Sequence, residues 1–137
     1  MGESFEHIRL VKAIRSYVGG LVPDGTQILI KSDLPESFEK PEKNERGYRS
    51  DIRYCYQCNL IIGEAKTTKD LETSHTQSQI ESYLIECNEY NGSSTFILGV
   101  PMADFSCAQN VITTAQRRLG TKVSVVVINE HGMTASL

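Results

Sequence analysis

The feature that most constrains this chain is a short apolar, β-branched run that leads directly into charged residues. Residues 60–62 are Leu, Ile and Ile, which typically fill a buried strand, and Glu64, Ala65 and Lys66 follow after a single glycine. Alternate side chains of a strand share a face, so we expect Glu64 and Lys66 side by side, with Ala65 pointing the other way. The chain must therefore place a carboxylate and an ammonium at the end of a core strand.

A second run, residues 51–56, precedes this strand, and the polar residues between the two runs are where the chain can reverse. If Gln57 and Cys58 form the turn of an antiparallel hairpin, Asp51 lies directly opposite Glu64, with the two Cβ atoms about 5 Å apart. Carboxylates this close repel and raise one pKa unless a divalent cation lies between them. Magnesium prefers oxygen ligands and takes one or two protein carboxylates, so the pattern predicts a metal site.

The same residues resemble a family. An aspartate, a hairpin turn, and an apolar strand followed by Glu-x-Lys is similar to the motif of the PD-(D/E)xK nuclease superfamily, which includes restriction endonucleases, Holliday-junction resolvases and RecB-type nuclease domains. Asp51, Glu64 and Lys66 match, and Ser50 stands where the family often has proline. The resemblance extends over residues 6–98.

Two further residues support the resemblance. Gln79 and Tyr83 reproduce the Gln-x-x-x-Tyr element that some RecB-like members carry on the next helix. The resemblance implies that Gln79 is catalytic. We also expect Tyr83 and the basic residues Arg49 and Lys69 to contact nucleic acid; alternatively, Tyr83 belongs to the core.

The resemblance also implies the composition of the metal site. Mg²⁺ or Mn²⁺ would be held by Asp51, Glu64 and the backbone carbonyl of Ala65, and Lys66 would act on the attacking water or the developing charge. The first helix of the family often adds a glutamate, which here is Glu6, with Glu3 as the second choice. Alternatively, Glu6 only complements the positive N-terminal end of its helix.

The hydrophobic pattern predicts an α/β fold in one domain, residues 1–137. Amphipathic helices are expected over residues 5–18, 70–91 and 108–119, and strands over 26–31, the two hairpin runs, 95–100 and 122–129. Residues 34–49 are rich in charge and predict an exposed, mobile loop, either a flap on nucleic acid or a solvated insertion. The order α-β-β-β-α-β-α-β gives a mixed sheet of about five strands flanked by helices, a restriction endonuclease-like core.

Composition limits the choice of function. The net charge of −3 argues against holding nucleic acid by charge alone, so we expect weak, salt-sensitive binding or help from a partner subunit. An enzyme of this kind that cuts duplexes would most simply act as a homodimer. Four cysteines include Cys55 and Cys58 in a CxxC spacing, but no second pair completes a zinc site. No apolar run is long enough for a membrane span and no signal segment opens the chain, so we expect a cytoplasmic protein.

The predicted function is a metal-dependent nuclease that hydrolyses phosphodiester bonds, with DNA as the expected substrate, in repair, recombination or host defence. Two alternatives remain open at this point. One is a nucleic-acid-binding subunit that does not cleave, and the other is a nuclease toxin domain that acts on tRNA or DNA.

Overall fold

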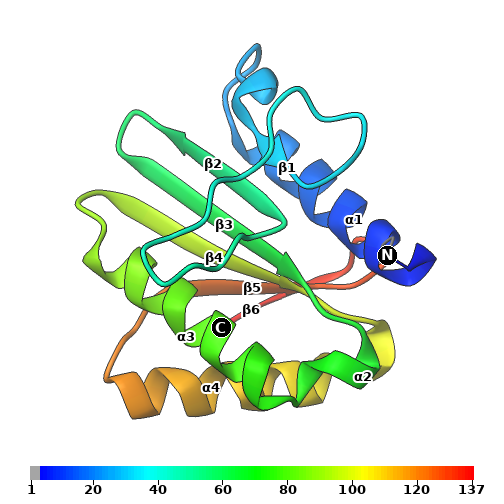
Figure 1. The fold of residues 1–137 in the computed structure, drawn as a ribbon, viewed down its shortest axis with the longest axis vertical. Helices are drawn as coiled ribbons and strands as arrows, with labels where there is room; N and C mark the ends of the chain where they lie inside the picture. The colour runs from blue at the N-terminus through cyan, green and yellow to red at the C-terminus, as the bar shows by residue number, and fades with distance from the viewer. Residues whose placement is uncertain (1–3) are drawn as a thin grey trace.

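The computed structural model describes residues 4–137 as a six-stranded mixed sheet with helices on both faces (Figure 1). The strands lie in sequence order across the sheet: β1 (Lys31–Ser32), β2 (Ile52–Tyr56), β3 (Asn59–Ala65), β4 (Ser93–Gly99), β5 (Ser124–Ile128) and β6 (Thr134–Ser136). Strands β3, β4 and β5 are parallel, and the β1–β2, β2–β3 and β5–β6 pairs are antiparallel. The α/β class and the mixed sheet flanked by helices are confirmed.

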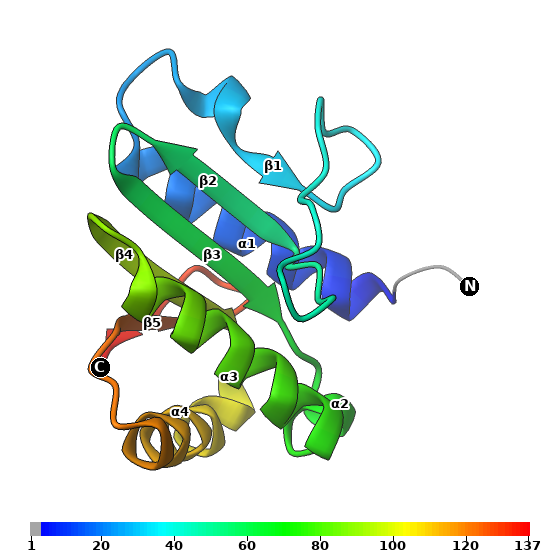
Figure 2. The same cartoon turned by 60° about the vertical axis from the view of Figure 1, so that its left-hand side comes forward.

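The helices form one layer on each side of the sheet. Helix α1 (Phe5–Leu21) covers one face, and α3 (Ser74–Glu89) and α4 (Phe105–Leu119) cover the other (Figure 2). The single-turn helix α2 (Thr68–Leu71) joins β3 to α3, and two 3₁₀ turns, η1 (Gln27–Leu29) and η2 (Met102–Asp104), precede β1 and α4. This arrangement buries both faces of the three parallel strands, as their apolar sequences require.

The alternation along β3 sorts its side chains between the two layers. Leu60 and Ile62 pack in the cluster under α3 and α4, whereas Ile61 and Ala65 pack in the cluster under α1. Glu64 continues the first series, so its side chain belongs to the α3 face. The register of the strand therefore decides which helix meets the carboxylate.

The predicted hairpin is confirmed in type and register. Tyr56 pairs with Asn59 and Ile52 pairs with Gly63, which is the predicted register; the ladder ends at Ile52, and Asp51 immediately precedes it. Both turn residues have a left-handed backbone, with φ 50° at position 57 and 61° at position 58. Positive φ at both central residues matches the type I′ turns that suit the twist of two-residue hairpins.

Helix α1 approaches the sheet closely over two glycines. A Cβ on Gly63 would lie 2.7 Å from Ile14 Cγ2, and one on Gly99 would lie 2.9 Å from Ile14 Cδ1. Ile14 is fully buried in this position. The absence of a side chain at both glycines therefore allows the helix to sit where it does.

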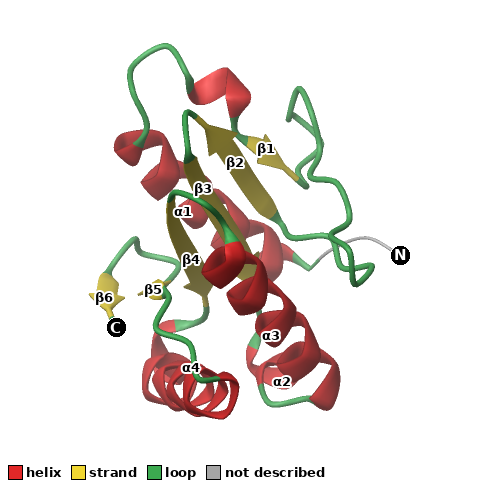
Figure 3. Cartoon of the chain, turned by 90° about the vertical axis from the view of Figure 1, so that its left-hand side faces the viewer, coloured by secondary structure: helices red, strands yellow, loops and turns green. Residues whose placement is uncertain are grey.

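Two expectations need correction. The predicted strand 26–31 is wrong, because Ile28 is 64% exposed and its segment forms η1, with only Lys31 and Ser32 reaching the sheet. The strand count and order also differ, because β6 adds a sixth strand that the sequence did not predict. Figure 3 shows β6 at the edge of the sheet opposite β1.

The charged segment 34–49 is largely exposed, as expected, but it is anchored at several points. Leu34 is 1% exposed and Pro41 is buried. Ion pairs join the first part of the segment to α1 and β1, through Lys12 to Glu36 at 3.8 Å and Lys31 to Glu39 at 3.5 Å. In Figures 1 and 2 the second part crosses the face of the sheet toward α3 before it enters β2.

In the part of the chain that the structure describes, none of the helices has the length and apolar character needed to cross a membrane.

Candidate active site

The end of the β2–β3 hairpin brings two carboxylates together below the surface. Asp51 immediately precedes β2 and is 6% exposed, and Glu64 is the penultimate residue of β3 and is 4% exposed. Acidic side chains are rarely this buried without a partner or a cation. The hairpin register therefore produces the paired carboxylates predicted from the sequence.

Asp51 is fixed from the α1 side. Its Oδ2 atom accepts a hydrogen bond from the backbone N–H of Ala65 at 2.9 Å and lies 3.2 Å from Nε2 of His7. His7 is in the first turn of α1, and its side chain is 15% exposed. One carboxylate oxygen is thus oriented by two donors from different elements.

Glu64, in contrast to Asp51, has one carboxylate oxygen that accepts no hydrogen bond. Its Oε2 lies 3.5 Å from Nζ of Lys66, but its Oε1 is buried without a hydrogen-bond partner. Burial, and then repulsion from Asp51, raise the pKa of Glu64 well above its ordinary value, although Lys66 opposes the shift. A cation at this point would relieve both the desolvation and the repulsion.

Helix α3 holds Lys66 in place. The Lys66 ammonium donates to Oε1 of Gln79, which is 8% exposed, so this side chain is positioned from the α3 layer. Gln79 lies one helical turn before Tyr83, and both are buried residues of α3. Gln79, which the resemblance implies is catalytic, thus contacts Lys66 directly in the structure.

Tyr83 requires a correction. It is 1% exposed and packs against Phe96, with ring centroids 5.8 Å apart, so the prediction that it contacts nucleic acid is wrong. Its hydroxyl lies toward Glu64 and favours the ionised carboxylate, yet it completes no hydrogen bond of normal geometry. Burial and the nearby Glu64 raise the pKa of Tyr83, which keeps the phenol neutral beside the carboxylates.

Of the remaining predicted residues, Glu6, Arg49 and Lys69 lie on the surface. Glu6 is exposed in the first turn of α1, where it can complement the helix N-terminus, whereas its neighbour His7 makes the contact to Asp51. Glu3 lies outside the described residues. Arg49 and Lys69 are exposed, as a contact with nucleic acid would require.

His7 is the site residue that sequence reasoning missed. It precedes the buried residues Val11, Ile14 and Val18 by four, seven and eleven positions, which places it on the buried stripe of α1. That spacing was visible in the sequence. A histidine continuing a buried stripe needs a polar partner, and Asp51 supplies one.

The residues present fit a hard divalent cation. No group of three Asp, Glu, His or Cys side chains within residues 4–137 is arranged to hold a metal ion, so a site made only of side chains is not formed. Magnesium, however, commonly uses one or two carboxylates and completes its shell with backbone carbonyls, water and substrate oxygens. Asp51 and Glu64, with an unpartnered oxygen on Glu64, meet that requirement.

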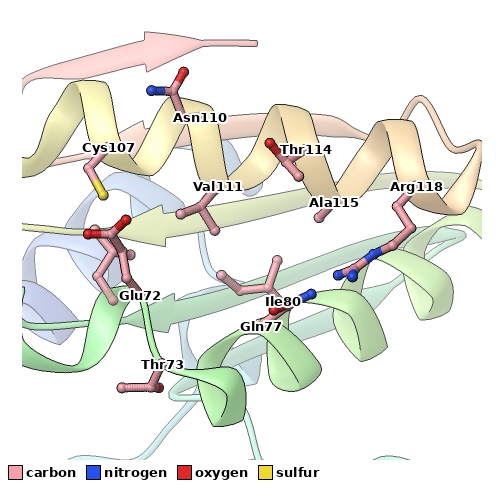
Figure 4. Close-up of a pocket in the computed structure, with 11 residues that line it drawn as sticks. Glu72, Thr73, Gln77, Ile80, Cys107, Asn110, Val111, Thr114, Ala115 and Arg118 are labelled. Atoms are coloured by element: carbon pink, nitrogen blue, oxygen red, sulfur yellow. The ribbon is translucent and has the colours of Figure 1, made fainter.

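A groove between α3 and α4 is separate from this site. It has a volume of about 580 Å³ and an apolar floor that includes Ile80, Val111 and Ala115 (Figure 4). Glu72 lies near one end and Arg118 near the other. None of the described residues that line the groove belongs to the candidate active site.

Comparison with known proteins identifies no relative of this chain. No family model matches the sequence, and neither a curated protein nor a solved structure gives a significant match. A functional interpretation therefore depends on the site itself.

Proposed function

We propose that this chain is a metal-dependent nuclease of the PD-(D/E)xK type, with a restriction endonuclease-like core, that hydrolyses phosphodiester bonds in nucleic acid, with DNA as the expected substrate. One observation carries the proposal: Glu64 is buried with one oxygen unpartnered, beside a second buried carboxylate and a lysine. Glu86 also has one buried, unpartnered oxygen in its ion pair with Arg53, so the feature that sets Glu64 apart is the second buried carboxylate beside it. Two buried carboxylates that repel each other are unfavourable unless a cation lies between them.

The cation would be Mg²⁺ or Mn²⁺, held by Asp51, Glu64 and, by resemblance to the family, the carbonyl of Ala65. When bound, such an ion would lower the pKa of a coordinated water and withdraw charge from the phosphate. The contact of Asp51 Oδ2 with the Ala65 N–H ties one carboxylate to the β3 backbone, so the candidate ligands are mutually oriented.

The lysine has a separate role. Gln79 and Glu64 hold the Lys66 ammonium in one orientation at the end of β3. An ammonium held in this way can orient an attacking water by hydrogen bonding, or stabilise negative charge that develops on the phosphate. Gln79 is then a positioning residue that acts through Lys66.

The test is cleavage of a panel of substrates in the presence of Mg²⁺ or Mn²⁺. Plasmid, single-stranded DNA, a four-way junction and tRNA would be incubated with the wild type and with Glu64→Ala and Lys66→Ala. We expect cleavage by the wild type, and loss of cleavage with EDTA and in both variants. The exposed residues Glu89 and Lys122 provide matched controls, because Glu89→Ala and Lys122→Ala change the same charges far from the site.

Two outcomes would contradict the proposal. Cleavage by Glu64→Ala would show that hydrolysis does not require the Glu64 carboxylate. Binding of the panel without cleavage of any member would indicate a nucleic-acid-binding module that does not cleave.

A further inference from the structure

An aromatic pair borders the candidate active site. The rings of Tyr48 and His75 are in edge-on contact, with centroids 5.7 Å apart and an interplanar angle of 67°. Tyr48 lies three residues before Asp51, and His75 lies one helical turn before Gln79 on α3. Both rings are therefore attached to segments that supply site residues.

The pair is preformed. The Asn44 side chain accepts hydrogen bonds from the backbone N–H groups of Arg46 and Tyr48, both at 3.0 Å, and donates to Ser82 Oγ on α3 at 3.1 Å. These bonds hold the segment that carries Tyr48 against the helix that carries His75. A ligand that used the rings would not have to order this segment first.

The rings are accessible. His75 is exposed and Tyr48 is half-buried. An edge-on contact covers one edge of one ring and at most one face of the other, so it leaves aromatic surface without an aromatic partner. Accessible ring surface on segments that flank the proposed nuclease site is suited to stacking on a nucleobase.

Three lysines on and around α1 and β1 are already paired, whereas Arg49 and Lys69 are exposed. Lys12, Lys31 and Lys40 are each paired with an acidic side chain, Glu36, Glu39 and Asp33 respectively, at 3.8, 3.5 and 3.6 Å. The whole chain has a net charge of −3. Duplex binding relies on free Lys and Arg that displace counterions from phosphates, whereas stacking requires only an accessible base face.

We infer that Tyr48 and His75 form a stacking platform for an unpaired nucleobase, so that the substrate is single-stranded nucleic acid or an unpaired segment of a longer one. This inference rests on the proposed nuclease function for its biological meaning. Its physical content is a binding preference, which can be measured without cleavage. The preference follows from a base face that is available in a single strand and hidden within a duplex stack.

The test measures binding in the Glu64→Gln background with EDTA, so that cleavage cannot interfere. Single-stranded DNA and RNA oligonucleotides that contain 2-aminopurine, and the corresponding duplexes, would be titrated with protein. We expect the single strands to bind at least about tenfold more tightly than the duplexes, with 2-aminopurine fluorescence quenched on stacking. Comparison of the DNA and RNA arms identifies which polymer is preferred.

Variants of His75 separate stacking from folding. Because His75 is exposed, His75→Ala should fold normally while it lowers single-strand affinity about tenfold and abolishes the quenching. His75→Phe retains a ring and should retain both. His131→Ala replaces another exposed histidine, in the turn before β6, and should change neither.

Equal affinity for single strands and duplexes would overturn the inference, as would unchanged binding by His75→Ala or loss of binding by His75→Phe. Self-association that His75→Ala abolishes, without oligonucleotide binding, would reassign the rings to a contact between copies. Ring-dependent binding by a wild type that cleaves nothing would sustain this inference and refute the proposed function. Duplex cleavage that His75→Ala does not change would support the proposed function and refute this inference.

Discussion

At the scale of single residues, Glu64 and His7 determine the electrostatics of the site. Glu64 is buried beside Asp51 with one unpartnered oxygen, and its pKa is raised by burial and by that neighbour. His7 reaches Asp51 from the far layer of the molecule. The two residues act differently, because ionised Glu64 destabilises the metal-free protein, whereas His7 holds Oδ2 of Asp51 in one position.

The raised pKa of Glu64 predicts a particular dependence of stability on pH. Below the unfolded-state pKa of about 4.3 both states hold the proton; above it the native state retains a proton that the unfolded state has lost. The stabilisation due to this proton is lost as the pH rises through the raised native pKa. We expect Glu64→Gln to remove that decline in the free energy of unfolding and to be more stable than wild type at neutral pH, without metal.

Urea unfolding with EDTA across a pH series checks this prediction. Glu89→Gln, an exposed replacement of the same kind, should follow the wild-type curve. Parallel pH profiles for wild type and Glu64→Gln would show that the carboxylate is not strained by its surroundings.

Replacement of His7 should weaken metal binding without removing a predicted ligand. His7→Ala frees Asp51 Oδ2 from one of its two donors, and the loss of groups that orient a ligand typically lowers metal affinity 10- to 100-fold. His7→Gln keeps a donor and should recover part of the affinity. Calorimetric titration with Mn²⁺ provides the measurement, with His131→Ala as the control; affinity unchanged in His7→Ala would contradict this role.

At the scale of elements, the hairpin turn stores backbone strain. Gln57 and Cys58 both have positive φ, a conformation that is unfavourable for residues with a Cβ by about 1–2 kcal/mol each and that asparagine and glycine accept more readily. Both side chains are exposed, so their replacement removes little packing. The residue types, rather than the turn geometry, are unusual.

We therefore expect Gln57→Asn combined with Cys58→Gly to raise the free energy of unfolding by about 1 kcal/mol. Chemical denaturation of wild type and the double variant would measure the change. Cys58→Ala keeps the Cβ and should give no gain; an equal gain in that variant would attribute the effect to removal of the thiol.

Elements with a strong pattern could be predicted from sequence, and those defined by weak pairing could not. The polar residues 57 and 58 predicted the hairpin turn. The helical spacing of apolar residues predicted α1, α3 and α4. The prediction of a strand over residues 26–31 was wrong because its two alternating isoleucines do not lie on one buried face: Ile30 is buried and Ile28 is exposed. Strand β6, which pairs with β5, has only three residues, Thr-Ala-Ser, and these contain no hydrophobic pattern that would predict a strand.

At the scale of the whole molecule, the site depends on the spacing between layers. His7 and Ile14 lie on the same helix, and Ile14 fits over Gly63 and Gly99 in the sheet. A displacement of α1 would therefore also move His7 relative to Asp51. The paired carboxylates were predictable because they depend on one local hairpin, but the histidine contact spans 44 residues and depends on how the layers pack.

Gly63→Ala tests this coupling. The added methyl would overlap Ile14, and overpacking of a core usually destabilises by about 1–3 kcal/mol. We expect lower stability together with weaker Mn²⁺ binding, measured by urea denaturation and calorimetry. Gly19→Ala, within α1 with open space around it, should instead stabilise by about 0.5–1 kcal/mol. Normal metal affinity in a destabilised Gly63→Ala would indicate that the helix position and the site are independent.

The outer strands of the sheet, β1 and β6, have two and three residues, while the interior strands of the parallel core have five to seven. Each edge thus offers only a short row of free backbone groups to another chain. An exposed edge usually leads to amyloid when strands of different molecules pair along it. The edges of this sheet have few free backbone groups for such pairing. We expect concentrated solutions to resist fibril growth even though the central strands, rich in valine and isoleucine, are of the kind that drives it.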